Sequence, residues 1–257
     1  MITSKDNQLI KYVKSLSQKK YRDLNKEYIV EGAKMVKEAL ENGENVTKLI
    51  LCDGFKFDNI NNYINNIEVE IVSDNIFKYI ADTMSPQGVL AVVKEKENIT
   101  KKYSNIIFAL DDLQDPGNLG TIIRTLDAAG YKDLILSKDT ADVYNPKVVR
   151  STMGGIFRLN LYKNINLLEE IPKLKKQGYK IVVTDLDTNK YYYDLDFNDK
   201  LVVVIGNESK GVSEEIKSLA DTRVIIPMIG KTESLNAAVA TSIIAYEGVR
   251  QKFAPKK

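Results

Sequence analysis

The residue types available for chemistry are restricted, because the 257-residue chain has no histidine and a single cysteine, Cys52. A serine or cysteine nucleophile with a histidine base is therefore excluded, and so is a zinc site with histidine ligands. One cysteine also rules out a disulfide framework or thiolate cluster within the chain and fits a reducing compartment. Any chemistry must rest on arginine, lysine, asparagine, serine, carboxylates, backbone amides or a bound cofactor, and we predict no metal site.

The first stretch that suggests a site is DDLQDPGNLG at 111–120, which follows an apolar, strand-like run and precedes a helix predicted over 121–129. Pro116 and Gly117 favour a tight turn. Arg124 then falls in the first helical turn, where the helix dipole favours an anion over a cation. A phosphate at this position would account for the arginine. An ordinary strand-to-helix turn with an exposed arginine explains the pattern equally well.

The second stretch, GNESKG at 206–211, follows the most strongly apolar run of the chain, LVVVI at 201–205. Its glycine spacing resembles that of a phosphate-binding loop, but Val212 stands where a P-loop needs lysine. A dinucleotide-binding G-x-G-x-x-G is also excluded, since Asn and Glu follow the first glycine. The carboxylate of Glu208 disfavours a bare polyphosphate and suits a ligand that carries a positive charge or hydroxyl groups.

The third stretch, IIPMIGKTESLN at 225–236, precedes a long helix predicted to begin near Leu235. Pro227 is expected to end the strand before it. Ser234 and Asn236 are residue types that cap helices, so a purely structural role is an open alternative for both.

Two blocks of alternating helices and strands position these stretches. The first contains two segments with helical spacing and three strand-like runs: 7–17 and 32–42, then 48–52, 69–72 and 89–93. Such a pattern predicts a small α/β domain. A charged segment at 94–104 without apolar periodicity is the best linker, which gives domains at 1–98 and 104–257. The second block is typical of a parallel sheet covered on both faces, in which ligands bind beyond the carboxyl ends of the strands.

Together the three stretches resemble the motifs of the SpoU (TrmH) family of RNA ribose 2′-O-methyltransferases. The residues that carry this resemblance are DPGNLGTIIRTLDAAG at 115–130, VVVIGNESKGVSEEI at 202–216 and IIPMIGKTESLNAAVA at 225–240. Their order, spacing and placement after predicted strands agree with the family. NPKVVRSTMGGIFRL at 145–159 and YIVEGAKMVKEAL at 28–40 are similar to it as well, so the resemblance covers nearly the whole chain.

The resemblance implies an α/β SPOUT-type methyltransferase domain whose C-terminal segment forms a trefoil knot in the region 201–250, preceded by a small α/β RNA-binding domain. Knots are rare, and apolar patterning alone does not suggest one. In the family the knot forms the S-adenosylmethionine pocket. The residues that by position should bind this cofactor are Thr184, Gly206, Asn207, Ile226 and Leu235. Members act as homodimers, so we expect the site to be completed across the interface.

The reaction implied by the resemblance is methyl transfer from S-adenosylmethionine to a ribose 2′-hydroxyl of 23S ribosomal RNA. A transfer RNA substrate, or a non-catalytic RNA-binding protein of the same fold, is the alternative. Positioning of the methyl donor and the hydroxyl acceptor should supply most of the rate acceleration. The motif-one arginine, here Arg124, acts as a base or binds the adjacent phosphate. Binding phosphate costs less, because a guanidinium ordinarily has a pKa above about 12. The residues expected to orient Arg124 and the ribose are Asn118, Glu208, Ser234 and Asn236.

The whole chain is nearly neutral, because 37 Lys and Arg against 35 Asp and Glu give a net charge of +2. Any basic surface must therefore be local. The side chains expected to contact RNA phosphates are Lys11, Lys19, Lys20, Arg22, Lys147 and Arg150. The solvated face of a helix is the alternative for those near the N-terminus, and an ordinary surface role for the other two.

No apolar run reaches the roughly 18 residues that a membrane span needs, and the N-terminus lacks an apolar signal-peptide core. We therefore expect a cytoplasmic protein that does not interact with membranes.

Overall fold

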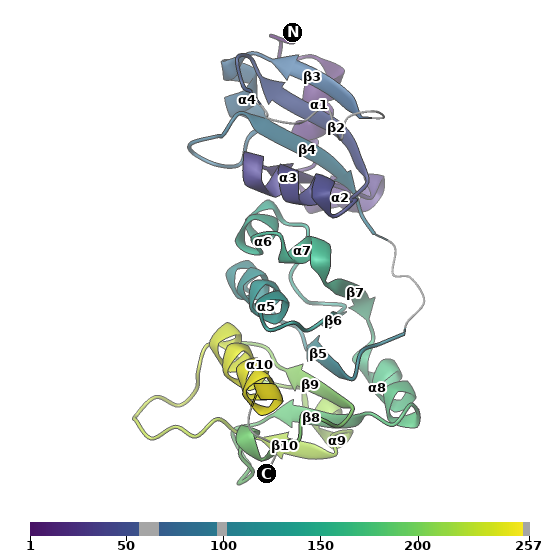
Figure 1. Ribbon diagram of the computed structural model, residues 1–257, viewed down its shortest axis with the longest axis vertical. Coiled ribbons are helices and arrows are strands. Elements are labelled where there is room, and N and C mark those ends of the chain that lie inside the picture. The colour runs from purple at the N-terminus through teal and green to yellow at the C-terminus, as the bar shows by residue number, and fades with distance from the viewer. Residues whose placement is uncertain (57–66, 97–101, 254–257) are drawn as a thin grey trace. The chain divides into compact units, whose positions relative to one another are not determined.

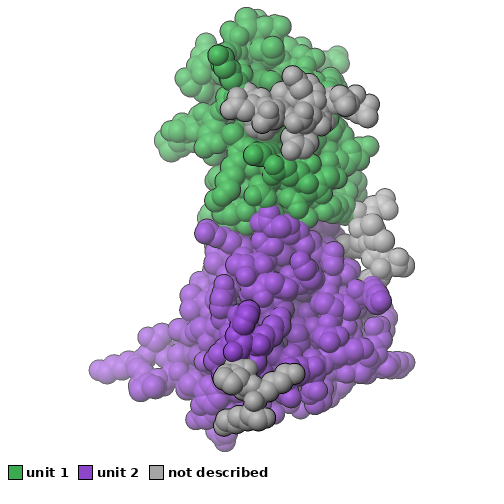
Figure 2. Space-filling view, viewed as in Figure 1, with its two compact units in different colours: residues 1–97, 142–157 green, residues 98–141, 158–257 purple. Residues whose placement is uncertain are grey.

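The computed structural model describes residues 1–56, 67–96 and 102–253, which fall into two compact units (Figure 1; Figure 2). The first unit comprises residues 1–97 and 142–157, and the second comprises residues 98–141 and 158–257. The expected division at one linker therefore differs from the observed one, because segment 142–157 packs with the first unit. The expected linker lies partly outside the described residues.

The first unit contains a four-stranded sheet of order β1-β4-β2-β3, in which β2 and β3 are parallel and the other neighbours antiparallel. Its strands are β1 (Glu27–Glu31), β2 (Val46–Cys52), β3 (Glu68–Val72) and β4 (Val89–Lys94). Its helices are α1 (Gln8–Ser15), α2 (Lys19–Asn25), α3 (Ala33–Glu41), α4 (Asp74–Ile80) and α6 (Pro146–Ser151).

Helix α1 shows why the first unit folds as it does. Asn7 caps it by accepting a hydrogen bond from the Leu9 amide at 2.9 Å. Ile10 and Val13 lie on one helix face and are buried, with α4 beside them, in a core formed with the sheet. The predicted helices and strands of this block are confirmed, whereas β1, α2 and α4 had no predicted counterpart. Strand β1 follows α2 after one residue and lacks the alternating pattern of a half-buried strand.

Arg22 ties segment 142–157 to the rest of the first unit. Its side chain is 3% exposed, and its guanidinium contacts Asp142, with Nε 3.0 Å from Oδ2. It also donates to two backbone carbonyls between α1 and α2, each at 2.8 Å. Tyr28 stacks on Tyr144 beside this pair, with ring centroids 4.2 Å apart. The expectation that Arg22 contacts RNA is therefore wrong, because its charge is already compensated inside the fold.

The second unit contains a six-stranded parallel sheet of order β10-β8-β9-β5-β6-β7. Its strands are β5 (Ile106–Leu110), β6 (Asp133–Ser137), β7 (Asn160–Ile165), β8 (Lys180–Thr184), β9 (Leu201–Ile205) and β10 (Thr222–Val224). Its helices are α5 (Pro116–Ala128), α8 (Leu167–Lys176), the 3₁₀ helix η2 (Tyr192–Asp194), α9 (Glu214–Ser218) and α10 (Ala237–Phe253), and α7 (Gly155–Arg158) spans a boundary between the units.

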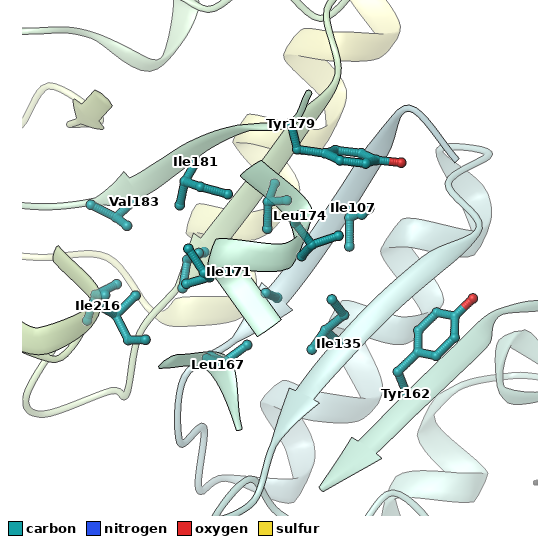
Figure 3. Packing of buried hydrophobic residues seen from close by; sticks show 14 residues of the cluster. Ile107, Ile135, Tyr162, Leu167, Ile171, Leu174, Tyr179, Ile181, Val183 and Ile216 are labelled. Atoms are coloured by element: carbon teal, nitrogen blue, oxygen red, sulfur yellow. The ribbon is translucent and has the colours of Figure 1, made fainter. Parts of the chain in front are cut away.

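Helices cover both faces of this sheet, as the sequence predicts. On one face Ile107 and Ile135 pack against Ile171 of α8 and the residues around α9 (Figure 3). The next residue of β5, Phe108, points to the opposite face, where it meets the ring of Tyr131. The Tyr131 hydroxyl donates to a carbonyl of α10, and α10 packs on α5. Strands β5, β6 and β9 are buried at every position, which explains their continuous apolar runs.

Three features of the second unit differ from the sequence expectations. Edge strand β7 has no predicted counterpart, because only one of its six residues is buried and half of them are polar. Helix α5 begins at Pro116 instead of 121, and α10 begins two residues after Leu235. Across the described ranges, no helix is both long and apolar enough to cross a membrane.

Candidate active site

A cavity of about 320 Å³ opens at the carboxyl ends of β8, β9 and β10, within the second unit. Its volume is at the lower end of the roughly 300–1,000 Å³ typical of small-molecule sites. The wall includes all five residues predicted to bind a cofactor: Thr184, Gly206, Asn207, Ile226 and Leu235. From the predicted catalytic set it includes Glu208 and Ser234. Arg124, Asn118 and Asn236 do not line the cavity in the described structure.

Gly206 permits the tight fold of the loop that forms one wall. A Cβ atom there would lie 2.0 Å from the carbonyl carbon of Gly211 and 2.1 Å from the nitrogen of Val212. The loop closes on itself because Asn207 and Gly211 exchange backbone hydrogen bonds of 3.0 and 2.9 Å. The Asn207 side chain accepts from two amides of the same loop and donates to the Asp112 carbonyl at 2.8 Å. That side chain therefore holds the loop in place.

Glu208 joins the second motif to the first. Its Oε1 accepts from the Asp115 amide at 3.0 Å and from Asn118 Nδ2 at 2.9 Å, while Oε2 accepts from the Gln114 amide at 3.1 Å. Asn118 Oδ1 in turn accepts from Asn236 Nδ2 at 2.8 Å. These hydrogen bonds connect all three motifs in one network, and they fix the orientation of the side-chain amides of Asn118 and Asn236.

In the third motif, a helix-capping residue also belongs to this hydrogen-bond network. Asn236 Oδ1 accepts from the amides of Ala238 and Val239, at 2.9 and 3.2 Å, so it caps α10. Asn236 therefore has the helix-capping role considered from the sequence, and it also donates a hydrogen bond to Asn118. Ser234 is exposed at the cavity wall, and its hydroxyl has no hydrogen-bond partner among the described residues. It remains available to a ligand.

Arg124 lies in the middle of α5, so the expectation that it occupies the first turn is wrong. The helix starts at Pro116 because Asp115 caps it, accepting from the Asn118 amide at 2.7 Å, and proline suits the first helical position. The argument from the helix dipole therefore fails. Arg124 is exposed and makes no hydrogen bond or ion pair with any described residue. The residues expected to orient it thus do not bond to it within this chain.

The profile of the SpoU rRNA methylase family matches residues 105–246, which include the whole cavity wall and all three motifs. The chain belongs to the SpoU rRNA methylase family. Residues 7–91 match a second profile, the MRM3-like substrate binding domain, which lies within the first unit. This SpoU protein thus has the two-domain organisation that its sequence predicts.

Similar proteins span nearly the full chain. The 23S rRNA (guanosine(2553)-2′-O)-methyltransferase RlmP of Bacillus subtilis strain 168 is 32% identical over 245 residues, covering 95% of this chain and 97% of that protein. The AdoMet-bound rRNA methyltransferase from Sinorhizobium meliloti superposes with a TM-score of 0.88 at 29% identity, covering 99% and 98% of the two chains. The SpoU methyltransferase AviRb from Streptomyces viridochromogenes, in complex with AdoMet, gives 0.85 at 28% identity, with coverage of 97% and 100%.

The wall of the SpoU cavity also contains residues that the sequence reasoning missed. Asp185 is buried and contacts the ammonium of Lys217 and the guanidinium of Arg223, each at 3.3 Å. Burial raises the pKa of Asp185, but the Asp187 amide and the Lys217 ammonium lower that pKa more, to below its usual range. The position of Asp185 directly after a predicted strand was a usable signal. No sequence signal pointed to Lys217, because it is one of many lysines in predicted helices.

The predicted RNA-binding residues of this SpoU protein have different surroundings. Lys11 pairs with Asp6 at 2.8 Å, Lys19 with Asp23 at 2.7 Å, and Arg150 with Asp82 at 2.8 Å. Lys20 lies over the ring of Tyr21, 5.8 Å from its centroid, and Lys147 is exposed. Except for Arg22, all of them reach the surface and stay proposed RNA contacts. In the described part of the chain, no three His, Cys, Asp or Glu side chains group as metal ligands.

Replacing Glu208 by glutamine is expected to weaken the link between the motifs. Burial raises the pKa of Glu208. Hydrogen bonds from the Asn118 side chain and from the Asp115 and Gln114 backbone amides lower that pKa by more, so that it lies below its ordinary value of 4.5. Its stabilising contribution is therefore complete above about pH 4.5 and is lost as the pH falls through the folded-state pKa. Because the side chain is exposed, we expect Glu208→Gln to cost only about 0.5–1 kcal/mol near neutral pH.

Urea unfolding of the wild type and Glu208→Gln, followed from near-neutral to acid pH, tests this expectation. The difference in unfolding free energy should shrink as the pH falls below the ordinary glutamate value. Glu215→Gln changes an exposed glutamate on α9 that is the matched control. A Glu208→Gln deficit that is independent of pH would contradict the role of the charge.

Proposed function

We propose that this SpoU protein transfers a methyl group from S-adenosylmethionine to the 2′-hydroxyl of a ribose in 23S ribosomal RNA. The observation that carries the proposal is the connection of all three motifs, through Glu208, Asn118 and Asn236, beside one cavity. The RlmP relative is named for this reaction, and two similar structures contain AdoMet. Because RlmP and the Sinorhizobium meliloti protein are named for ribosomal RNA, we also propose a cytoplasmic enzyme.

The cavity suits a ligand with the chemistry of S-adenosylmethionine. Aliphatic side chains such as Val212 and Ile226 form apolar parts of the wall, which suit an adenine ring. Gly206 brings main chain to the wall where a Cβ atom would collide with the loop. Asp187 supplies an acceptor for hydroxyl or amino groups, whereas the charge of Lys217 is already paired with Asp185 and Glu214. When bound, the cofactor supplies an electrophilic methyl group on a sulfonium centre.

The protein side chains then orient the acceptor and promote loss of its proton to solvent water. The bonded pair Asn118 and Asn236 holds the start of α5 next to the start of α10, beside the wall that carries Ser234. We propose that the Ser234 hydroxyl contacts the ribose. Arg124 has no acidic partner among the described residues, so its charge is available for the phosphate adjacent to the target ribose. That contact would stabilise the developing 2′-oxyanion.

We also propose that the C-terminal segment forms the knot of the family. Three segments of the chain line one cavity, namely 205–212, part of 224–228 and part of 234–240, and α10 then packs on α5, which precedes them in sequence. This return of the chain to an earlier element supports a threaded path. The matching structures, with TM-scores of 0.85 and 0.88, support the same path over the full chain.

The partner of α10 is, in this proposal, a second copy of the chain. Val239, Tyr246 and Phe253 are 48%, 49% and 84% exposed and recur every seven residues, which places them on one helix face. A helix that is apolar on nearly all sides is expected to be covered on more than one side. A homodimer through this face would bring further groups, such as the partner's arginine, to each site.

Tyr246→Asp is expected to shift the protein from dimer to monomer, because a charge would be placed within an apolar interface. Sedimentation velocity measures the change directly. Leu168→Asp alters an equally exposed side chain on α8, 45% exposed, and should leave the dimer intact. A dimer that persists in Tyr246→Asp at low micromolar concentration would refute an interface on this face.

Methyl transfer to unmodified transcripts tests the function itself. Tritiated S-adenosylmethionine is incubated with the protein and 23S rRNA, 16S rRNA or total tRNA transcripts, and 2′-O-methylation is then mapped by resistance to alkaline cleavage. Incorporation into 23S rRNA alone supports the proposal. Incorporation into tRNA alone would assign the enzyme to that substrate. No incorporation, together with no heat of cofactor binding, would favour a non-catalytic RNA-binding protein.

A further inference from the structure

Two lysines of the first unit share one aromatic ring. The ammonium of Lys5 lies 4.7 Å from the ring centroid of Tyr79, and that of Lys14 lies 5.2 Å from the same centroid. Lys14 is in the last turn of α1, and Tyr79 is on α4, which packs against α1 (Figure 1). Tyr79 is 36% exposed, so the cluster is at the surface.

These two lysines differ from the other basic residues around them. Lys11 is paired with Asp6, Lys19 with Asp23 and Lys78 with Asp74, each at 2.7 or 2.8 Å, and Arg22 is buried. Lys5 and Lys14 make no ion pair with any described residue. The fold has therefore compensated several of the nearby cations with carboxylates and has left two uncompensated charges beside one ring.

Such an arrangement is only marginally favourable without a further ligand. A cation–π contact at an exposed site is weak. The two ammonium groups carry like charges beside the same ring and therefore repel each other. An anion beside the ring would cancel this repulsion and bind both donors. Phosphates of a nucleic acid strand are such anions, and this unit matches a substrate binding domain in an RNA methylase family.

We propose that Lys5, Lys14 and Tyr79 form an RNA-backbone site, in which the two lysines bind phosphates of one strand and Tyr79 holds their ammonium groups in position. The inference rests on the proposed function, because it names the part of the first unit that engages the RNA. It also adds to the sequence-based choice of residues, since neither Lys5 nor Lys14 is among the side chains predicted to contact RNA phosphates.

Salt-dependent binding of a fluorescein-labelled, mixed-sequence 20-nucleotide single-stranded RNA tests the site in the full-length protein. Each phosphate contact contributes about 0.7 to the slope of log affinity against log salt concentration. Lys5→Gln/Lys14→Gln should therefore lower that slope by about 1.4 and weaken binding roughly tenfold or more at 0.1 M salt. Tyr79→Leu keeps both charges, so it should weaken binding while the slope stays nearly constant.

The matched control removes the same charge from paired lysines. Lys37 pairs with Glu41 at 3.6 Å and Lys78 with Asp74 at 2.7 Å, each pair one helical turn apart. Lys37→Gln/Lys78→Gln should change the slope by less than half as much as Lys5→Gln/Lys14→Gln. Equal slope changes in both double variants would overturn the proposal, because net charge alone would then explain binding.

Two readouts separate this inference from the proposed function. S-adenosylmethionine affinity, measured by calorimetry, should be the same in wild type and Lys5→Gln/Lys14→Gln, because neither lysine is among the residues that line the cavity. An unchanged salt slope in a double variant that binds cofactor and methylates RNA would overturn the RNA site alone. Absence of methyl transfer and cofactor binding in the wild type would overturn the enzyme assignment, whatever the slope.

Discussion

Arg124→Ala is expected to reduce the rate of methyl transfer by roughly 10²–10³-fold, the usual effect of removing one group that stabilises transition-state charge. S-adenosylmethionine affinity should stay within about twofold of wild type, because Arg124 is not among the cavity-lining residues. Stability should also change little, since the side chain is exposed and has no hydrogen bond or ion pair with a described residue. Loss of rate without loss of binding or folding is the signature of a group used during the reaction.

Single-turnover methyl transfer to 23S rRNA transcript and calorimetry with S-adenosylmethionine measure the two effects separately. Arg124→Lys keeps the charge but loses the planar fork, so it should recover only part of the rate if the arginine binds phosphate. Lys132→Ala removes an exposed cation outside the proposed site and is the control for net charge. Wild-type rate in Arg124→Ala would exclude Arg124 from the mechanism.

Gly206→Ala is expected to cause the largest loss of cofactor affinity of any single methyl addition in the chain. The added Cβ would lie 2.0 Å from the Gly211 carbonyl carbon and 2.1 Å from the Val212 nitrogen, so the loop backbone must move. Overpacking of this kind costs roughly 1–3 kcal/mol or more. If the displaced loop must return before the cofactor binds, affinity falls by roughly 10- to 100-fold.

The test compares cofactor affinity in Gly206→Ala with that in Gly230→Ala. A Cβ atom at Gly230 meets nothing within 4 Å, although this glycine lies in the third motif stretch. Gly230→Ala should therefore bind S-adenosylmethionine as the wild type does. Circular dichroism of both variants checks that the sheet remains folded. Equal cofactor affinity in Gly206→Ala and wild type would show that the loop is not part of the binding site.

Glu208 illustrates how tertiary contacts changed the interpretation of a motif residue. Its carboxylate disfavours a polyphosphate, and on that basis the sequence places a cation or hydroxyl groups next to it. In the folded chain three donors from 114–118 already occupy the carboxylate. Its principal role is therefore to hold the first motif against the second. No periodicity could reveal this, because the contacts join residues 90 or more positions apart.

The sequence by itself determined the parallel sheet, the helices on its two faces and the cavity at its carboxyl edge. Local physics suffices for these features, because continuous apolar runs must be buried and loops after parallel strands must meet at one edge. The resemblance to the SpoU family also predicted five residues of the cavity wall, which lie in or near the second and third motifs and at the end of β8. The absence of histidine meanwhile restricted the candidate chemistry to arginine, amides and carboxylates.

Only the tertiary structure decided which charges are available. Arg22 and Lys14 are both basic residues of one short N-terminal segment, yet Asp142 neutralises the first, whereas the second shares the Tyr79 ring with Lys5. The packing of segment 142–157 onto the first unit likewise rests on contacts across more than 100 residues. Whether a side chain is buried and paired depends on neighbours that the fold brings together from distant parts of the sequence. Local sequence patterns do not identify those neighbours.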